Sequence, residues 1–209
     1  MKIQILIDNP NSWVIPYAEK LVSLLKEMGH NVFLIYKHSD VVSGDILCLL
    51  SCEKIFNSLG MNRHNLVVHE SDLPQGKGWS PLTWQILEGQ NIIPITLFEA
   101  SEVVDSGPVY FKDHIVLKGN ELIGEIRQKQ GDATIDLIVK FIKSLPEVEG
   151  FEQKGDESFY PKRTIIDSKL DLEKSLNDQF NLLRVCDNER YPAWFEYKGR
   201  KYIIKIFAE

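Results

Sequence analysis

The sequence lacks three features that would each indicate a particular class of protein. Its three cysteines, in a chain of 209 residues, are an odd number without the spacing of a disulfide framework. No apolar run approaches the roughly 18 residues that a membrane-spanning helix needs. Basic residues are also not in excess, since the chain has 24 lysines and arginines and 30 acidic residues. Its net charge is -6. We therefore expect no disulfide scaffold, no membrane partner and no nucleic-acid partner, because nucleic acid requires a basic surface.

The cysteines and the first residues add two further expectations. Cys48 and Cys52 lie in the apolar stretch DILCLLSCEK, where cysteine behaves as a small hydrophobic residue. No second Cys/His pair accompanies them, so no zinc or other metal site is expected. Met1 and Lys2 lead into the run IQILI, which is too short for the apolar region of a signal peptide. The sequence therefore predicts a cytoplasmic protein.

Apolar runs alternate with amphipathic segments in the first half of the chain. Runs typical of strands covered on both faces occupy Lys2–Asp8, Asn31–Lys37, Asp45–Ser51 and Asn65–Ser71. A helix is predicted between the first two, because apolar residues recur there at steps of three and four. These residues are Val14, Ala18, Leu21, Leu25 and Met28. Strand, helix and strand in this order predict parallel βαβ units, and hence an α/β fold with a Rossmann-like parallel sheet.

Further elements divide the chain into three parts. We expect a catalytic core over residues 1–145, a polar linker rich in turn residues over 146–171, and a C-terminal appendage over 172–209. The appendage is predicted to contain a helix at Leu172–Val185 and a hairpin that turns at Lys198-Gly199. The other predicted helices are Glu53–Leu59, Pro81–Gly89, Asn120–Gln130 and Ala133–Leu145.

The candidate catalytic residues are a histidine and an aspartate at the ends of strand-like segments. His69 ends the run VVH and enters a loop punctuated by proline and glycine, and ligands gather at the carboxyl ends of strands in such sheets. Histidine can transfer a proton near neutral pH when a carboxylate orients it, and Asp105 in VVDSGP is the best candidate. The residue types alone also fit a backbone-bonded histidine and an aspartate that only forms a turn.

A glycine-rich loop, LPQGKGWSP, follows His69 by a few residues. Gly76 and Gly78 would let the backbone approach a ligand closely, and Lys77 between them offers a positive charge for phosphate. The spacing differs from that of a nucleotide-binding P-loop. Trp79 could stack on a ligand or could simply pack against the loop.

Taken in order, these segments resemble the N10-formyltetrahydrofolate-dependent formyltransferases. That family carries an Asn-x-His-x-Ser-x-Leu-Pro signature, a glycine loop, a threonine-bearing strand and an Asp-x-Gly loop. The matching residues are His69, Ser71, Leu73, Pro74, Gly76, Gly78, Pro81, Thr96, Asp105 and Gly107. The C-terminal segment, with YPKRTIIDSKLDLEKS and YPAWFEYKG, also resembles the corresponding segment of the family. It is most similar to that of the small sugar N-formyltransferases. The resemblance implies the formyltransferase type of Rossmann-like sheet with a small helix–hairpin appendage.

The resemblance also implies the chemistry. An amine attacks the formyl carbon of the folate, His69 carries over as the proton shuttle, and Asp105 carries over as the residue that orients it. The family's asparagine stabilises the oxyanion, but Val67 stands at that position here and has no side-chain donor. Asn65 is the nearest asparagine on the same strand face, although it lies about 13 Å along the strand from His69.

The resemblance further indicates where the two substrates bind. The folate donor, N10-formyltetrahydrofolate, is expected against the backbone of two segments, which consist of Leu50, Ser51 and Cys52 and of Glu102, Val103 and Val104. By elimination, the acceptor is expected to be a nucleotide-linked amino sugar, as in the synthesis of a surface glycan such as lipopolysaccharide. The residues expected to contact the acceptor are Gly76, Lys77, Gly78, Trp79 and Arg163.

Two other functions stay open on the sequence alone. Val67 is compatible with a non-catalytic relative that binds folate or a nucleotide. Formylation of methionyl-tRNA, another activity in the family, would need a basic surface that the composition does not indicate. A homodimer is conceivable through the edge of the C-terminal hairpin.

Overall fold

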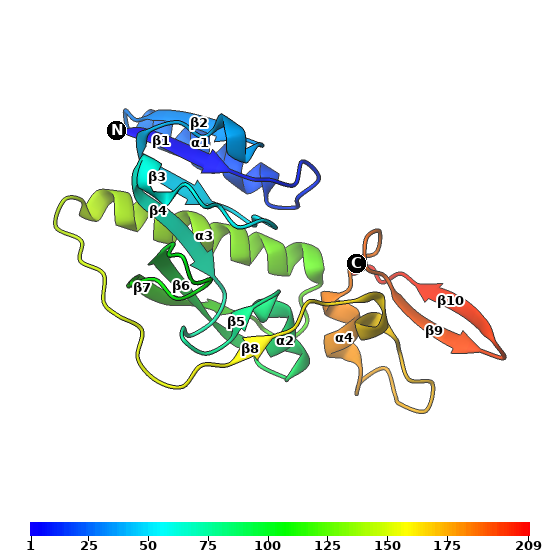
Figure 1. Ribbon diagram of the computed structural model, residues 1–209. Helices are drawn as coiled ribbons and strands as arrows, with labels where there is room; N and C mark the ends of the chain where they lie inside the picture. The colour runs from blue at the N-terminus through cyan, green and yellow to red at the C-terminus, as the bar shows by residue number, and fades with distance from the viewer.

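A mostly parallel sheet of six strands forms the centre of the fold. The computed structural model describes residues 1–209, and Figure 1 shows the sheet in the order β2-β1-β3-β4-β6-β7. Its strands are β1 (Lys2–Leu6), β2 (Asn31–Ile35), β3 (Gly44–Leu49), β4 (Asn62–His69), β6 (Ile92–Glu99) and β7 (Val109–Val116). The first four in this order are parallel, whereas β6 and β7 are antiparallel to their neighbours. The predicted α/β fold with a Rossmann-like sheet is confirmed.

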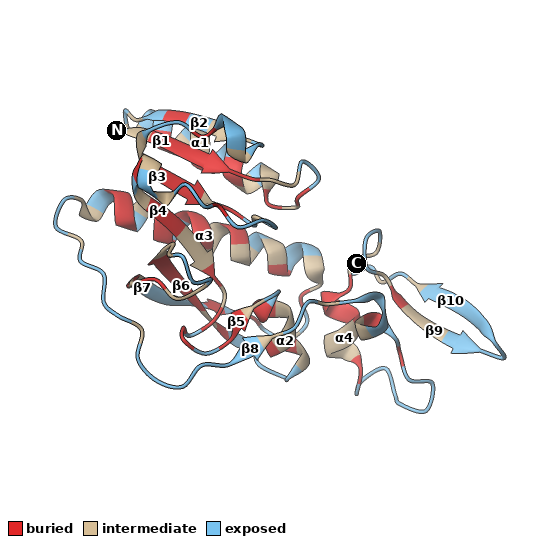
Figure 2. Cartoon of the chain, in the orientation of Figure 1, coloured by how far each residue is buried: buried red, intermediate tan, exposed pale blue.

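Two helices cover one face of this sheet. Helix α1 (Ile15–Glu27) lies over β1 and β2, and the longer α3 (Ile123–Ser144) packs on β4, β6 and β7. Alternate residues of the strands point at these helices and form a single buried core, as the period of two in a strand requires. On the other face, Leu6 and Leu47 are covered by irregular chain that includes Phe56. Figure 2 shows the buried strands in red.

The structure differs from the predicted helices in three places. Residues 53–58 are irregular, and the only helical turn nearby is η2 (Leu59–Met61). The two helices expected over 120–145 are the single helix α3, which passes through Gly131 without a break. A Cβ at Gly131 would lie 2.2 Å from the ring of Tyr17, so the glycine allows two helices to pack closely and does not end one of them.

The last helix is also shorter than predicted. Only Phe180–Val185 forms helix α4, because the chain before it is closed into a loop by one side chain. Gln179 accepts a hydrogen bond from the backbone N–H of Asp171 at 2.6 Å and donates to the carbonyl of Asp171 at 2.9 Å. The backbone groups of this segment are thus engaged by a side chain and do not form a helix.

The segment expected as a linker runs back over the core. In Figure 1 it leaves α3 as a long arc and ends at β8 (Phe159–Tyr160), which pairs in parallel with β5 (Lys77–Gly78). The 3-10 turn η3 (Ile165–Ser168) and α4 follow. The predicted hairpin is observed as β9 (Ala193–Tyr197) and β10 (Arg200–Ile204), which Figure 2 shows projecting from the body and largely exposed.

Two short helices complete the fold, η1 (His38–Asp40) after β2 and α2 (Pro81–Leu87) after β5. The latter matches the helix predicted at Pro81–Gly89, with proline at its start. No helix of the structure combines the length and the apolar character that crossing a bilayer would require.

Candidate active site

His69 lies where β4 leaves the sheet, and the loop that follows holds its ring. The residue pairs with Thr96 of β6 in the sheet register and is almost fully buried. Its Nε2 atom lies 2.8 Å from the carbonyl oxygen of Gly76. Because a carbonyl can only accept, Nε2 carries the proton in the neutral ring, and Nδ1 keeps the lone pair that can take up another. The glycine loop therefore selects the tautomer of His69.

Asp105 reaches the same place from the loop between β6 and β7. Its backbone is left-handed, with φ +54°, a conformation that non-glycine residues rarely adopt. One carboxylate oxygen, Oδ2, accepts a hydrogen bond from the backbone N–H of Gly78 at 2.9 Å and lies 3.9 Å from Nε2 of His69. The two side chains are about 10% exposed, at 9% for His69 and 10% for Asp105. A carboxylate at this distance would stabilise the protonated ring.

Two glycines are required by close contacts at this site. Gly78 has φ +97°, and a Cβ there would lie 2.5 Å from the carbonyl oxygen of Tyr160 in β8. A Cβ on Gly107 would lie 1.7 Å from the carbonyl oxygen of Glu99. Both loops that carry the His69–Asp105 pair are therefore pressed against neighbouring backbone.

Lys77 does not offer a free positive charge at this site. Its side chain is only 2% exposed. The ammonium donates to Ser106 at 2.6 Å and to Glu157 at 2.5 Å. Lys77 thus joins the glycine loop, the Asp105 loop and the segment before β8, and its charge is already balanced.

Asn65 is not part of the His69–Asp105 pair. It is buried, and its side-chain amide donates to the carbonyl of Leu59 at 2.9 Å and to Glu99 at 3.3 Å. The strand does not bend to bring it to His69, because β4 runs without a bulge over Asn62–His69. Between them, Val67 packs against a small apolar cluster that contains Phe98.

The two remaining candidates for acceptor binding differ in their availability. Trp79 is exposed beside Gly78, and the ammonium of Lys162 lies 4.4 Å from the centre of its ring. Arg163 is bound within its own turn, where Nη2 donates to the hydroxyl of Ser168 at 3.1 Å. Lys162, next to Arg163 in the chain, is therefore the exposed cation at this surface.

The two segments expected to bind the donor have free backbone donors. The N–H groups of Glu102, Val103 and Val104 make no hydrogen bond within the protein, and the two valine side chains are exposed. The N–H groups of Ser51 and Cys52 are also unpaired, and Ser51 adopts a left-handed φ of +51°. Unpaired amides beside apolar side chains are suited to a flat heterocycle with hydrogen-bonding edges.

Glu70, directly after His69, is the acid beside the pair whose pKa is shifted from its ordinary value. Burial raises the pKa of its carboxyl, while the positive charge that His69 can carry acts in the opposite direction. The carboxylate accepts a hydrogen bond from Gln130 of α3 at 2.7 Å. It therefore points toward α3, on the side of β4 opposite to His69.

Three residues of the segment before β8 belong to the site and were not predicted. Gln153 donates to the carbonyls of Asp105 and Gly107, Glu157 pairs with Lys77, and Ser158 accepts from the N–H of Gly76 at 2.8 Å. The polar composition of this segment suggested a linker, but it suits equally a segment whose side chains bind the backbone of the two loops. The sequence does not show this role, because the loops lie far from the segment along the chain.

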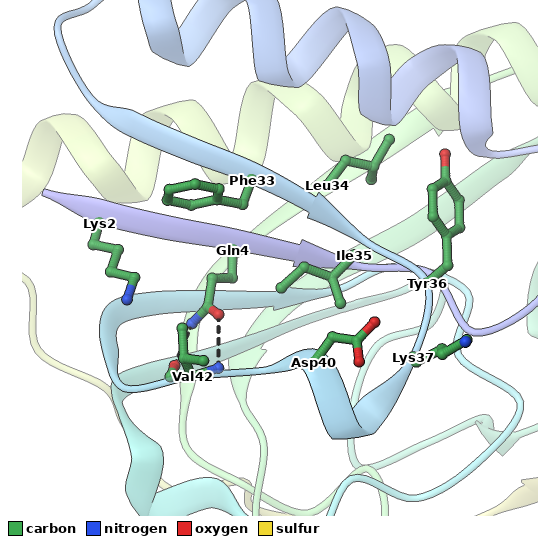
Figure 3. A pocket seen from close by; sticks show the side chains of 9 residues that line it. All are labelled: Lys2, Gln4, Phe33, Leu34, Ile35, Tyr36, Lys37, Asp40 and Val42. Atoms are coloured by element: carbon green, nitrogen blue, oxygen red, sulfur yellow. Dashed lines mark hydrogen bonds between the residues drawn. The ribbon is translucent and has the colours of Figure 1, made fainter.

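A concave region lies away from this site. A cleft of about 540 Å³ lies against β1 and β2. Figure 3 shows the side chains that line it. It is lined by Lys2, Gln4, Phe33, Leu34, Ile35, Tyr36, Lys37, Asp40 and Val42. None of these residues belongs to the His69–Asp105 site.

Comparison with known proteins identifies the relatives of this chain. No protein-family model matches it. The methionyl-tRNA formyltransferase of Thermosipho melanesiensis is 32% identical over 141 residues, which are 68% of this chain and 45% of that protein. The match thus spans about half the length of this curated relative.

Solved structures agree on the fold. Methionyl-tRNA formyltransferase from Clostridium thermocellum covers 100% of this chain and 93% of its own, with a TM-score of 0.84 at 20% identity. The formyltransferase resemblance is confirmed. The sugar N-formyltransferase from Shewanella sp FDAARGOS_354 has a TM-score of 0.70 at 16% identity, with coverage of 100% and 98%. HypX from Aquifex aeolicus, solved with tetrahydrofolic acid, has a TM-score of 0.80 at 19% identity, with coverage of 99% and 37%.

Proposed function

We propose that the chain is a folate-dependent N-formyltransferase that acts on a nucleotide-linked amino sugar. The observation that carries the proposal is the geometry of His69 and Asp105, which lie 3.9 Å apart on loops in the order typical of formyltransferases. The identity to a curated methionyl-tRNA formyltransferase supports the reaction class. A role in the synthesis of a surface glycan, in the cytoplasm, would follow from this acceptor.

The residues present fit a folate. The free N–H groups of Glu102 to Val104 and of Ser51 and Cys52 can serve the polar edge of a pterin, and the exposed side chains of Val103 and Val104 can cover its ring. When bound, N10-formyltetrahydrofolate supplies the formyl group as an activated acyl donor. HypX, whose structure was solved with tetrahydrofolic acid, shares the fold.

The roles of the chain's own groups follow from the hydrogen bonds. Nδ1 of His69 is free to take a proton from an attacking amine, because Nε2 is held by the carbonyl of Gly76 at 2.8 Å. Asp105 then stabilises the positive ring and is itself held in place by the N–H of Gly78. The burial of both side chains strengthens this interaction, since water screens it little.

The negative charge that develops on the formyl oxygen must be stabilised differently here than by the family's asparagine. Val67 occupies the family's asparagine position and can donate no hydrogen bond. The N–H groups of His69 Nε2 and of Gly78 are already engaged by Gly76 and Asp105. One well-placed donor is worth about 3–4 kcal/mol in acyl transfer, so a lower turnover than in relatives with the asparagine is expected.

The exposed surface beside the pair supports the proposed acceptor. Trp79 offers a face on which a nucleobase can stack, and Lys162 beside it supplies a positive charge for phosphate. Lys77 and Arg163, which the sequence favoured for phosphate, are engaged elsewhere. The sugar N-formyltransferase of Shewanella sp FDAARGOS_354 matches over nearly its whole length.

The proposal is tested by formyl transfer from N10-formyltetrahydrofolate to a panel of amino sugar nucleotides. We expect turnover that His69→Ala and Asp105→Ala each lower at least about 100-fold, a loss typical of a proton shuttle and its partner. Arg63→Ala, an exposed change at the start of β4, serves as the control. Folate binding without turnover on sugar, purine-precursor or tRNA acceptors would instead support a non-catalytic binding protein.

A further inference from the structure

Gln153 touches the Asp105 loop at two points. Its side-chain Nε2 donates to the carbonyl of Asp105 and to the carbonyl of Gly107, each at 2.9 Å. Two residues before Gln153, Phe151 exchanges two backbone hydrogen bonds with Val109, of 2.8 and 2.9 Å, and these anchor the segment to β7. One side-chain amide thus binds the backbone on either side of Ser106.

The Asp105 loop needs such support. Asp105 has a φ of +54°, and a non-glycine residue in this region costs of order 1 kcal/mol or more unless its surroundings hold it. The exposed residues Val103 and Val104 give the loop no core contact. Its other ties are the hydroxyl of Ser106, which accepts from Lys77, and the carboxylate of Asp105 itself.

Only the NH₂ group of the Gln153 side-chain amide forms hydrogen bonds. Its Oε1 atom is buried and has no hydrogen-bond partner in the protein. The side chain is therefore held by its two N–H groups, which both point at carbonyls of one loop. A residue of similar shape without these donors would leave two carbonyls unsatisfied and release the loop.

We propose that Gln153 is a positioning residue that fixes the backbone of Asp105 and so aims its carboxylate at His69. The backbone torsions of Asp105 determine both where its carboxylate points and where its carbonyl points. Because the side-chain amide of Gln153 holds that carbonyl, it also holds the torsions that direct the carboxylate. The catalytic part of this inference rests on the proposed function, because it takes Asp105 as the partner of His69.

The isosteric variant Gln153→Glu tests the catalytic part. It keeps the shape but replaces the donor by a carboxylate that repels the two carbonyls. We expect kcat for formyl transfer to fall about 10- to 100-fold with the acceptor KM within about threefold, since misplacement of a catalytic group acts on the chemical step. Lys154→Gln changes the net charge equally at an exposed neighbouring position and is expected to have no effect.

Two further readouts separate positioning from a general loss of structure. The carboxyl group that Gln153→Glu introduces can donate again once it is protonated, so the ratio of variant to wild-type kcat is expected to rise as pH falls. Gln153→Ala, which removes the donor without adding charge, should lower kcat similarly. An unchanged kcat in both variants would overturn the inference.

Hydrogen exchange gives a readout that does not depend on activity. The Gly78 N–H is protected by the carboxylate of Asp105, while the N–H groups of Lys77 and Trp79 bond to Ser158 and Tyr160 of the neighbouring chain segment. In Gln153→Ala we expect exchange at Gly78 to accelerate at least about tenfold with Lys77 and Trp79 unchanged.

The outcomes distinguish the two proposals. Unchanged exchange at Gly78 would show that Gln153 does not hold Asp105, and the inference would be wrong. Faster exchange at Gly78 in a protein without turnover on any acceptor would mean that the proposed function fails while the structural role of Gln153 stands.

Discussion

Gly107 has no room for a side chain, because the carbonyl oxygen of Glu99 lies 1.7 Å from the place of its Cβ. The obstacle is backbone of β6, which cannot rotate away as a side chain could. We expect Gly107→Ala to lower the free energy of unfolding by about 2–3 kcal/mol, the cost of forcing atoms into a packed site. Urea unfolding followed by fluorescence measures the change. Gly124→Ala is the matched control, since a Cβ at Gly124 meets nothing within 4 Å.

Val67 stands where the formyltransferase signature has its asparagine. We expect Val67→Asn to raise kcat at least about tenfold, because a single oxyanion donor is worth about 3–4 kcal/mol. The same change should cost about 1 kcal/mol of stability, since Val67 packs against Leu73 and Phe98. The measurement is kcat from steady-state kinetics at saturating N10-formyltetrahydrofolate. An unchanged kcat would mean that another group already serves the oxyanion.

Glu70 gives the stability of the protein a dependence on pH. Burial raises the pKa of its carboxyl in the folded state, so the folded protein binds this proton more tightly than the unfolded chain does. The ionised carboxylate therefore destabilises the fold increasingly as pH rises above the ordinary value of 4.5. Glu70→Gln should keep the contact with Gln130 and remove this penalty.

The measurement is the difference in free energy of unfolding between Glu70→Gln and wild type as a function of pH. We expect the difference to be close to zero below pH 4.5, where both states of the wild type are protonated, and to favour the variant increasingly at higher pH. A difference that does not change with pH would show that Glu70 has an ordinary pKa.

Single residues were predictable where their chemistry is local. His69 and Asp105 stand at the ends of apolar runs, and the structure brings them together. Gln153 and Glu157 carry no such local mark, because their partners lie 48 and 80 residues away in the chain. Asn65 shares a strand face with His69, and the sequence already predicts about 13 Å of strand between them unless β4 bends. The strand is regular over Asn62–His69, so the two side chains stay apart.

At the scale of elements, the pairing of the short strands β5 and β8 holds the glycine loop beside the loop that carries Asp105. Lys77 of β5 was expected to bind phosphate, yet its ammonium is buried against Ser106 and Glu157. Lys77→Met removes the charge while keeping most of the length and the apolar stem. We expect the KM for an amino sugar nucleotide to change less than about threefold, because a charge that is already paired contributes little to binding.

The comparison for Lys77 is the exposed cation at the same surface. Lys162→Met is expected to raise the acceptor KM about tenfold, as loss of one phosphate contact would, with kcat nearly unchanged. If Lys77→Met instead raises KM more than Lys162→Met does, the lysine must leave its ion pair when the acceptor binds.

Periodicity predicted strands and the amphipathic helices better than it predicted where helices end. The strands of the parallel half of the sheet and α1 follow from apolar spacing alone. The break expected near Gly131 was wrong because the glycine packs on Tyr17, a contact that no local signal reveals. The long helix expected before the hairpin was wrong because Gln179 binds the backbone of its own loop.

For the whole molecule, net charge separates the candidate acceptors. With a net charge of -6, the chain offers no general field for a polyanion. We expect initiator tRNA to bind more weakly than about 10 µM at about 0.15 M salt, measured by fluorescence anisotropy with a methionyl-tRNA formyltransferase as positive control. Saturable binding in the low micromolar range that weakens with added salt would favour tRNA as the acceptor.

The arc from α3 to β8 also determines when the site can exist during synthesis. The N–H of Gly76 bonds to Ser158, 82 residues further along the chain, so the loop that holds His69 is completed by a late part of the polypeptide. Contacts of such long separation form slowly, because closing a long stretch of chain costs conformational entropy before the contact stabilises anything. On the ribosome, the sheet and α3 can assemble while the loops that carry His69 and Asp105 are still open. The newly made protein is therefore expected to be folded before it is active.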